Sequence, residues 1–335
     1  MKRRGTVTPM TPRPCCDGAM RELHLLSCAP AEAGGGIYRC RLSANGTLTK
    51  TDYLPCDRPM YAVMDGERLH VLLRAPFAGS EESGYVSCKA DFSDVTKPVG
   101  TNGKCACHLA VCGEDVYAVN YLSGSLTKIG EMTVTHTERS VNGNPIRQEA
   151  PHTHYVGLSV DNRFVFCTDL GADTLFVYDC KLNEVSRAKV PKGYGIRHLV
   201  LTRDGRTIYA VNELVPSVSR FSFVDGAVTY LETVLLPCEV PASTAAAIRL
   251  SEDEKRLYTS VRGENRIFVL NTEDGAPKLF HSFPSGGQGP RDFDLIDGFL
   301  IVCNEDSDEV SVPETETGEK RFSLPMKHPL CCVCP

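Results

Sequence analysis

The sequence predicts an all-β protein folded as a seven-bladed β-propeller, with about four antiparallel strands per blade. One unit recurs seven times along the chain: a turn, four to six β-prone residues, then a polar or cysteine residue, with steps of 42 to 49 residues. No amphipathic run of helical periodicity interrupts these units. A repeat in the forties that contains only short strands is typical of propeller blades. Turn dipeptides fall between the strands: Asn45-Gly46, Asp65-Gly66, Asn102-Gly103, Asp204-Gly205, Asp225-Gly226 and Asp274-Gly275.

The repeating units set the expected domain organisation. In chain order they end at Cys28, Arg74, Asn120, Asp169, Glu213, Arg262 and Asn304. We therefore expect one propeller over residues 21–327, preceded by an arm over 1–20 and followed by a cysteine-rich tail over 328–335. A closed ring has no free sheet edge, so we expect a terminal strand over residues 320–324 to pair beside the strand near residues 23–28. Residues 151–179 would form the inner half of the fourth blade.

Composition limits the function classes. A net charge of −6 and a pI near 5.9 argue against a nucleic-acid surface. The chain contains no run of 18 apolar residues and no apolar segment behind its basic N-terminus, so we expect no membrane span and no secretory signal. Most of the 16 cysteines stand singly in β-prone runs, as reduced thiols of a cytoplasmic protein would. No paired CxxC spacing indicates zinc, and we expect no metal or cofactor, and a monomer or weak homodimer.

Polar residues at equivalent points of successive blades meet around the central channel, although they lie some 46 residues apart. Opposite charges gathered in one channel perturb each other's pKa, which is the usual setting of a functional site. One set lies at the ends of the units: Asn120, Asp169, Glu213, Arg262 and Asn304. A second set lies just upstream of the β-prone runs: His108, His152, His154, Arg197, His198 and Arg291.

Five motifs in order resemble the seven-bladed propeller lactonases, a family that includes propeller-type 6-phosphogluconolactonases and carboxymuconate cyclases. The resemblance covers about residues 23–325. It implies hydrolysis of a sugar lactone in the central channel, typically 6-phosphoglucono-1,5-lactone, without a redox cofactor. The motifs are Asn120-Tyr121; Pro151-His152-Thr153-His154 with Asp169-Leu170-Gly171; Gly195-Ile196-Arg197-His198 with Asn212-Glu213-Leu214; Arg262-Gly263; and Gly289-Pro290-Arg291-Asp292-Phe293 with Asn304-Glu305-Asp306-Ser307.

The resemblance gives these residues provisional roles. Opening a lactone needs a base for water, charge stabilisation at the carbonyl oxygen and an acid for the leaving alkoxide. We expect Glu213 to act as the base and His154 or His198 as the acid. Arginine forks suit phosphate or carboxylate. The substrate-binding candidates are Arg197, Arg262, Arg291, His152, Asp169 and Asn120. Each has a structural alternative: Asp169 can cap a turn, Asn120 can satisfy backbone at a strand end, and the arginines can join blades by ion pairs.

The chain departs from the family pattern at four positions, which are Arg74, Ala106, Ile196 and Val261. Arg74 adds a cation where the family usually presents a carboxylate or amide, which favours a more anionic ligand. Because propellers host many functions, two other functions stay open. One is a non-catalytic propeller that binds a small anion or a protein partner, and the other is a muconate-type cyclase or isomerase.

Overall fold

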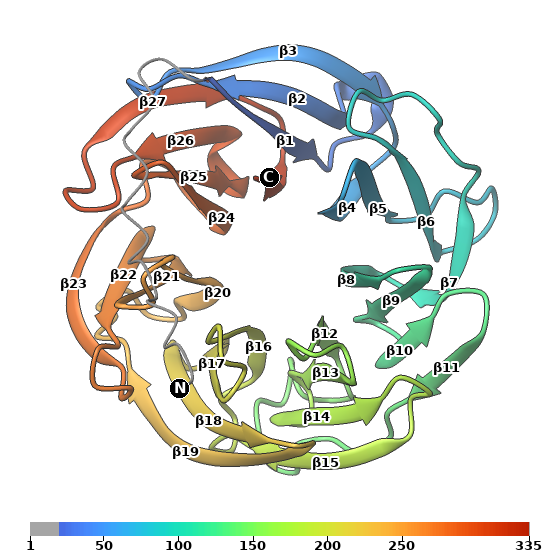
Figure 1. The fold of residues 1–335 in the computed structure, drawn as a ribbon, viewed down its shortest axis with the longest axis vertical. Helices are drawn as coiled ribbons and strands as arrows, with labels where there is room; N and C mark the ends of the chain where they lie inside the picture. The colour runs from blue at the N-terminus through green and yellow to red at the C-terminus, as the bar shows by residue number, and fades with distance from the viewer. Residues whose placement is uncertain (1–19, 335) are drawn as a thin grey trace, which may run out of the picture.

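The computed structural model describes residues 20–334, in which seven four-stranded antiparallel sheets are arranged radially around one axis (Figure 1). This confirms the predicted seven-bladed propeller. Two single-turn 3-10 helices, η1 (Ala31–Ala33) and η2 (Glu305–Ser307), are the helical elements of this part of the chain. No helix within residues 20–334 has the length and apolar character needed to cross a membrane.

Each blade runs from an innermost strand at the channel to an outermost strand at the rim. In that order, blade 1 is β28 (Pro329–Val333), β1 (Arg21–Ser27), β2 (Gly36–Leu42) and β3 (Leu48–Pro55), and blade 2 is β4 (Pro59–Asp65), β5 (Arg68–Leu73), β6 (Glu82–Lys89) and β7 (Val99–Lys104). Blade 3 is β8 (Ala106–Cys112), β9 (Asp115–Asn120), β10 (Ser125–Lys128) and β11 (Met132–Thr135), and blade 4 is β12 (Thr153–Leu158), β13 (Phe164–Asp169), β14 (Thr174–Asp179) and β15 (Glu184–Lys189). Blade 5 is β16 (Ile196–Leu201), β17 (Thr207–Asn212), β18 (Ser217–Val224) and β19 (Ala227–Leu235); blade 6 is β20 (Thr244–Leu250), β21 (Arg256–Arg262), β22 (Arg266–Asn271) and β23 (Lys278–Pro284); and blade 7 is β24 (Pro290–Ile296), β25 (Phe299–Asn304), β26 (Glu309–Pro313) and β27 (Lys320–Pro325).

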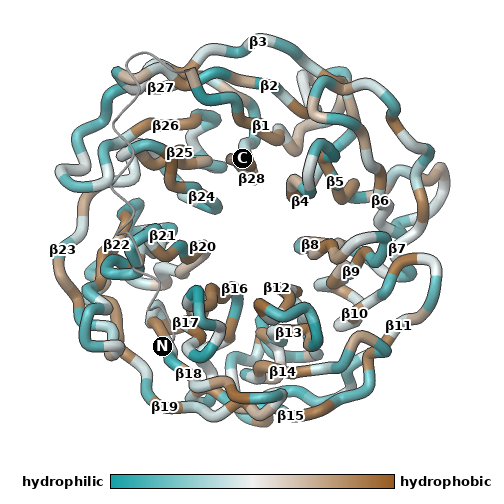
Figure 2. The backbone as a smooth tube through the Cα atoms, viewed as in Figure 1, coloured by the Kyte–Doolittle hydropathy of each residue, from teal (hydrophilic) through white to brown (hydrophobic). Residues whose placement is uncertain are grey.

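The repeating units found in the sequence are the second strands of the seven blades. In β17, five of six residues are buried, because the neighbouring blades cover both faces of the sheet. The outermost strands, such as β15, alternate exposed and half-buried residues. Figure 2 shows hydrophobic and hydrophilic residues interspersed along the strands of the blades. Residues 151–179 supply β12, β13 and β14, as expected for the inner part of blade 4.

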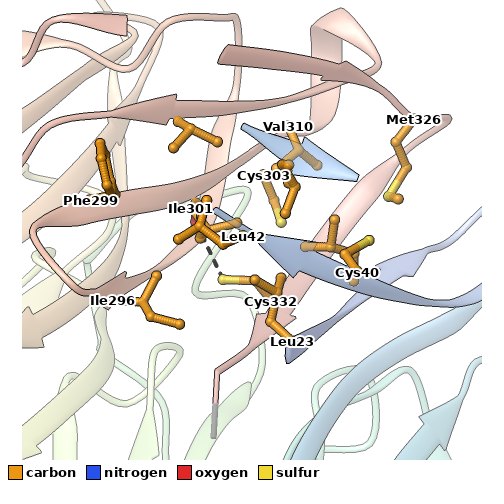
Figure 3. Packing of buried hydrophobic residues seen from close by; sticks show 13 residues of the cluster. Leu23, Cys40, Leu42, Ile296, Phe299, Ile301, Cys303, Val310, Met326 and Cys332 are labelled. Atoms are coloured by element: carbon orange, nitrogen blue, oxygen red, sulfur yellow. Dashed lines mark hydrogen bonds between the residues drawn. The ribbon is translucent and has the colours of Figure 1, made fainter. Parts of the chain in front are cut away.

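Apolar side chains between blades form the core. At the junction of the first and last blades, Leu23, Cys40 and Leu42 pack against Ile301 and other residues of blade 7 (Figure 3). Such clusters recur between the other neighbouring blades. Burial of each such side chain stabilises the fold by about 1.5–3 kcal/mol.

The chain closes its ring differently from the prediction. The segment expected to pair with β1 is instead β27, the outermost strand of blade 7, which pairs with β26. The strand that pairs with β1 is β28, so residues 329–333 belong to the propeller and not to a separate tail. The physical reason is burial: β28 is buried along its whole length, whereas β27 begins with the exposed Lys320 and Arg321. The predicted arm over residues 1–20 lies outside the described residues except for Met20.

The turn predictions are confirmed at most positions and wrong at one. The Asp225-Gly226 pair joins β18 to β19 with φ of 47° and 87°, the left-handed geometry of a two-residue hairpin turn. Asn102-Gly103, by contrast, lies inside β7. Asn102 still has a positive φ of 53°, so the dipeptide marks an irregularity in the strand.

Candidate active site at the channel mouth

The repeat brings one residue from each of six blades to the same end of the channel. The N–H of Glu213, directly after β17, donates to the carbonyl of Gly195, directly before the inner strand β16, over 2.7 Å. Cys28, Arg74, Tyr121, Leu170 and Glu305 make the equivalent bond in their own blades. We call these six residues the mouth ring. Each follows the second strand of its blade and lies beside the first residue of the inner strand, at the same end of the channel.

Glu213 is the centre of an ion-pair cluster within this ring. Its Oε1 lies 2.7 Å from Nη2 of Arg147 and 3.1 Å from Nη2 of Arg262, and its Oε2 lies 2.9 Å from Nε of Arg197. Only 2% of the Glu213 side chain is exposed. The three arginines come from the loop between blades 3 and 4, from β16 and from the end of β21, so the carboxylate joins three parts of the propeller.

The charges of this cluster do not balance. Burial raises the pKa of Glu213, whereas the guanidinium groups of Arg262 and Arg197 lower it. Their combined effect is larger than that of burial, so the net shift of this pKa is downward. The carboxyl group is therefore ionised, and three cations surround one anion. Nε of Arg197 and Nη2 of Arg262 lie close to Glu213 but have no well-aligned hydrogen bond among residues 20–334. Nε of Arg262 is also buried and has no hydrogen bond in the same part of the chain. Buried donors without a partner are rare in proteins, and this one suits an oxygen-rich anion.

His154 is a neutral base beside the cluster. Burial and the nearby Arg197 hold its pKa well below the ordinary value of 6.5. Its Nδ1 lies 4.0 Å from Sγ of Cys107, and its ring meets the Tyr121 ring edge-on at 5.6 Å between centroids. The Tyr121 hydroxyl in turn accepts a hydrogen bond of 3.1 Å from Nη2 of Arg147. His154 is thus connected to the Glu213 cluster through Tyr121.

His198 lies next to His154 but belongs to a deeper layer of the channel. Its ring centroid is 5.1 Å from those of both His154 and His108. His108 stacks in turn on Tyr61 at 4.1 Å and packs against the tilted ring of Tyr155 at 4.3 Å. These rings form the floor of a cavity of about 420 Å³ that continues along the inner strands to residues such as Asp65 at their far ends. Nε2 of His198 is buried and has no partner in the described part of the chain.

Arg291 lies on the other side of the mouth. Its Nη1 is 3.2 Å from Oε2 of Glu305, and both residues line a second cavity of about 540 Å³. Burial lowers the pKa of Arg291, but Glu305 and Glu213 raise it, and the net shift is upward. Arg291 thus lines the second cavity and is close enough to Glu213 to interact with it electrostatically.

Three other site candidates are held by contacts of their own. Both ring nitrogens of His152 are engaged, with the Tyr121 carbonyl at 3.0 Å and with Glu149 at 3.1 Å. The fully buried Asp169 accepts hydrogen bonds from the N–H groups of His152 and Ala172 and lies 2.6 Å from Nδ1 of His136.

The amide of Asn120 bonds to Thr101 and to hydroxyl groups of strand β10. The structure thus does not bring His152, Asp169 or Asn120 into the Glu213 cluster. For Asn120 and Asp169 the reason is register: each is the last residue of its strand, while the mouth ring takes the following residue, Tyr121 or Leu170. Successive side chains of an extended chain point to opposite sides.

Two residues of the site were not among the sequence candidates. Arg147 lies between β11 and β12, in an irregular segment that carries no repeat register. Tyr121 was part of a quoted motif, but its role depends on its contacts with Arg147 and His154. No group of three or more His, Cys, Asp or Glu side chains is arranged to hold a metal ion within residues 20–334.

With the fold and this geometry established, similarity to known proteins identifies the family. The family model described as "Lactonase, 7-bladed beta-propeller" matches residues 24–328. The chain therefore belongs to the seven-bladed β-propeller lactonase family, and the activity class that this membership supports is lactone hydrolysis. An uncharacterized protein of Lactococcus lactis, YwcC, is 30% identical over 347 residues, which cover 94% of this chain and 100% of the relative.

Solved structures agree with the fold. The periplasmic gluconolactonase PpgL of Pseudomonas aeruginosa has a TM-score of 0.82 at 22% identity, covering 94% of this chain and 98% of its own. A Bacteroides uniformis protein provisionally described as a 6-phosphogluconolactonase has a TM-score of 0.81 at 24% identity, covering 93% and 99%. At these identities the likeness is one of fold alone.

Proposed function

We propose that this protein hydrolyses a sugar lactone at the channel mouth and that 6-phosphoglucono-1,5-lactone is its substrate. The observation that carries the proposal is the convergence of Arg147, Arg197 and Arg262 on the buried Glu213, next to the neutral His154. Such a cluster has two more positive than negative charges. An anionic substrate and a negatively charged transition state both fit that excess.

The chemistry assigns one proton path. Neutral His154 takes a proton from water as the water oxygen bonds to the lactone carbonyl carbon. The carbonyl oxygen becomes an oxyanion that the guanidinium groups of Arg197 and Arg262 stabilise, the latter through its buried Nε–H, which has no hydrogen bond among residues 20–334. The ring C–O bond then breaks, and the leaving alkoxide receives the proton from the His154 imidazolium, which leaves the free acid of the sugar and the starting enzyme.

Glu213 has a different role in this proposal from the one expected from the sequence. A carboxylate whose pKa is lowered by surrounding arginines is a weak base. Its contacts instead make it a positioning residue, which holds three guanidinium groups together against their mutual repulsion. His154 replaces it as the base, and His198, one layer deeper, is a neighbour of that base.

A coupled assay tests the proposal. Release of 6-phosphogluconate from 6-phosphoglucono-1,5-lactone is followed with a dehydrogenase, and the spontaneous hydrolysis rate is subtracted. We expect acceleration that His154→Asn abolishes in a protein with unchanged circular dichroism. No acceleration of either the phosphorylated or the unphosphorylated lactone, together with saturable binding of the product, would instead support a non-catalytic anion-binding propeller.

A further inference from the structure

The second cavity at the channel mouth is lined by more cationic than anionic side chains. Its lining residues come from blades 7, 1, 2 and 3 and the loops beside them. Four cationic side chains line it, from Arg58, Arg74, Arg291 and Lys327, against the two carboxylates of Glu305 and Asp308. This leaves two positive charges in excess, although the whole chain carries a net charge of −6.

The pairing of these charges leaves Arg74 available. Arg291 pairs with Glu305 and Lys327 with Asp308, each at 3.2 Å. Arg58 lies 3.6 Å from Asp57, a loose pair whose members are both more than 40% exposed. The Arg74 side chain makes no ion pair or hydrogen bond with any residue in the range 20–334. Arg74 is also the mouth-ring counterpart of Glu213 and Glu305, so blade 2 presents a cation where blades 5 and 7 present carboxylates.

The backbone at the cavity wall supports a binding role. The residue directly before the inner strand has a positive φ in five blades. In blades 5 and 7 this residue is Gly195 or Gly289, each with φ of 67°, and glycine adopts this geometry without steric cost. In blades 1, 2 and 3 it is His328, Arg58 or Cys105, with φ of 45°, 45° and 56°.

All three of these side chains line the same cavity. The left-handed conformation is unfavourable for a residue with a Cβ atom. The backbone is therefore strained at His328, Arg58 and Cys105, which line the cavity. It is not strained at the equivalent positions of blades 5 and 7, where the residue is glycine. Backbone strain of this kind is concentrated at functional sites, and here the three strained residues line the same cavity.

We propose that this cavity is the subsite for a phosphate ester group of the substrate, bound by Arg74 and Arg58 with Lys327 beside them. The inference rests on the proposed function, because the cavity lies at the same channel end as the Glu213 cluster, where the lactone carbonyl would react: Cys28, Arg74 and Glu305 of the mouth ring line it. A phosphate monoester carries nearly two negative charges at neutral pH, which matches the excess of the cavity. The subsite makes the enzyme selective for phosphorylated lactones over neutral ones.

Two variants test the subsite. Arg74→Met removes the free cation and keeps the apolar stem, and Arg58→Gly removes a cation while giving the backbone the residue that its φ prefers. For each variant we expect kcat/KM for 6-phosphoglucono-1,5-lactone to fall at least tenfold, mainly through KM, with the value for glucono-1,5-lactone unchanged. The control is Arg163→Met, on an exposed turn of blade 4, which should alter neither value.

Thermal unfolding separates loss of binding from loss of folding, since Arg58→Gly should keep or raise the melting temperature. Equal kcat/KM of the unmodified protein for both lactones, or an equal loss for both in the variants, would overturn the subsite while leaving lactone hydrolysis intact. If neither lactone is hydrolysed, titration calorimetry compares the affinity of the protein for 6-phosphogluconate with its affinity for gluconate and so tests the subsite by binding alone. Tighter binding of the phosphorylated compound that Arg74→Met abolishes supports the subsite, and equal binding overturns it.

Discussion

Nη2 of Arg147 lies 2.7 Å from Oε1 of Glu213, although the two residues are 66 positions apart in the chain. Arg147 comes from the segment that links blades 3 and 4, and Glu213 follows the second strand of blade 5. The contact closes the third side of a cluster that Arg197 and Arg262 begin. Glu213 is thus a counter-ion shared by three arginines, and removing its charge should leave all three of them without this partner.

Replacing Glu213 with glutamine should lower the free energy of unfolding of the protein as well as its lactonase rate. The variant keeps the shape of the side chain but leaves three guanidinium groups without a counter-ion, of which that of Arg197 is buried and that of Arg262 mostly buried. Removing one partner of a buried ion pair typically costs about 3–5 kcal/mol, and the partial exposure of Arg147 places the expected loss near the lower value. Urea unfolding measures it.

The matched control is Glu232→Gln, which removes the partner of Arg220 near the surface. This pair is half-buried on the outer strands of blade 5, and an ion pair near the surface contributes about 0–1 kcal/mol. Equal stability losses in the two variants would contradict the shared counter-ion role of Glu213. A Glu213→Gln protein with full lactonase rate would also exclude any part for Glu213 in catalysis.

The pH profile of lactonase activity should identify His154 as the base. Because burial and Arg197 hold its pKa well below 6.5, its imidazole is neutral and able to accept a proton throughout the range from pH 6.5 to 8. We expect kcat/KM to be flat over this range and to fall only at more acidic pH. Removing a general base by His154→Asn should lower the rate about 10²–10⁴-fold.

His281→Asn, on the outermost strand of blade 6, serves as the control and should keep both the rate and the profile. An acidic limb centred at or above pH 6.5 would show that the titrating base is another group. An unchanged rate in His154→Asn would exclude His154 directly.

Much of the fold could be predicted from the sequence because each blade repeats one local pattern. The strands of the repeat, such as β17, read as nearly continuous β-prone runs ended by a polar residue, and hydrogen bonding within each sheet sets the order of the neighbouring strands. The end of such a strand is less certain by one residue, since Asn120 and Tyr121 are both plausible endings. That single step separates a residue bonded inside its own blade from one that reaches the channel mouth.

The closing strand and Arg147 could not be predicted for a different reason. Residues 329–333 pair with β1, some 300 positions away, and nothing local distinguishes an apolar closing strand from an apolar tail. Arg147 reaches Glu213 through an irregular segment, where no periodicity tells which side chain points inward. Both contacts depend on the closed ring, so they follow from the fold and not from the pattern.

Removal of β28 should prevent stable folding. A chain that ends at His328 loses the innermost strand of blade 1, exposes the hydrogen-bonding edge of β1 and leaves the clusters around Leu25 and Leu26 uncovered. Burial of Leu330 and Val333 alone contributes about 2 kcal/mol each. We expect the truncated chain to aggregate on expression, measured as the fraction in the cleared lysate.

Supplying residues 327–335 as a synthetic peptide during refolding provides the control. A peptide that adds the missing strand to the exposed edge should restore monomeric protein, since edge pairing uses the same backbone hydrogen bonds. A truncated chain that stays monomeric and unfolds at the same urea concentration as the full chain would contradict the structural role of β28.

Stability should fall in mild acid because of three histidines packed together in the channel. Burial holds the pKa of His108, His154 and His198 well below 6.5, while the unfolded chain titrates them near that value. Below pH 6.5 the unfolded state therefore binds more protons than the folded state, and the free energy of unfolding decreases as the pH falls, by up to about 1.4 kcal/mol per pH unit for each histidine.

The depressed pKa of Glu213 acts in the same direction at lower pH, since its contribution is complete above the unfolded value of 4.5 and declines below it. Urea unfolding at pH 7.5, 6.5 and 5.5 isolates the histidines, because Glu213 is ionised in both states over most of that range. In His108→Phe the ring still packs between Tyr61 and Tyr155 but no longer titrates. The slope between pH 6.5 and 5.5 should then drop by about one proton, and a slope equal to that of the unmodified protein would show that His108 is not one of the groups that resist protonation.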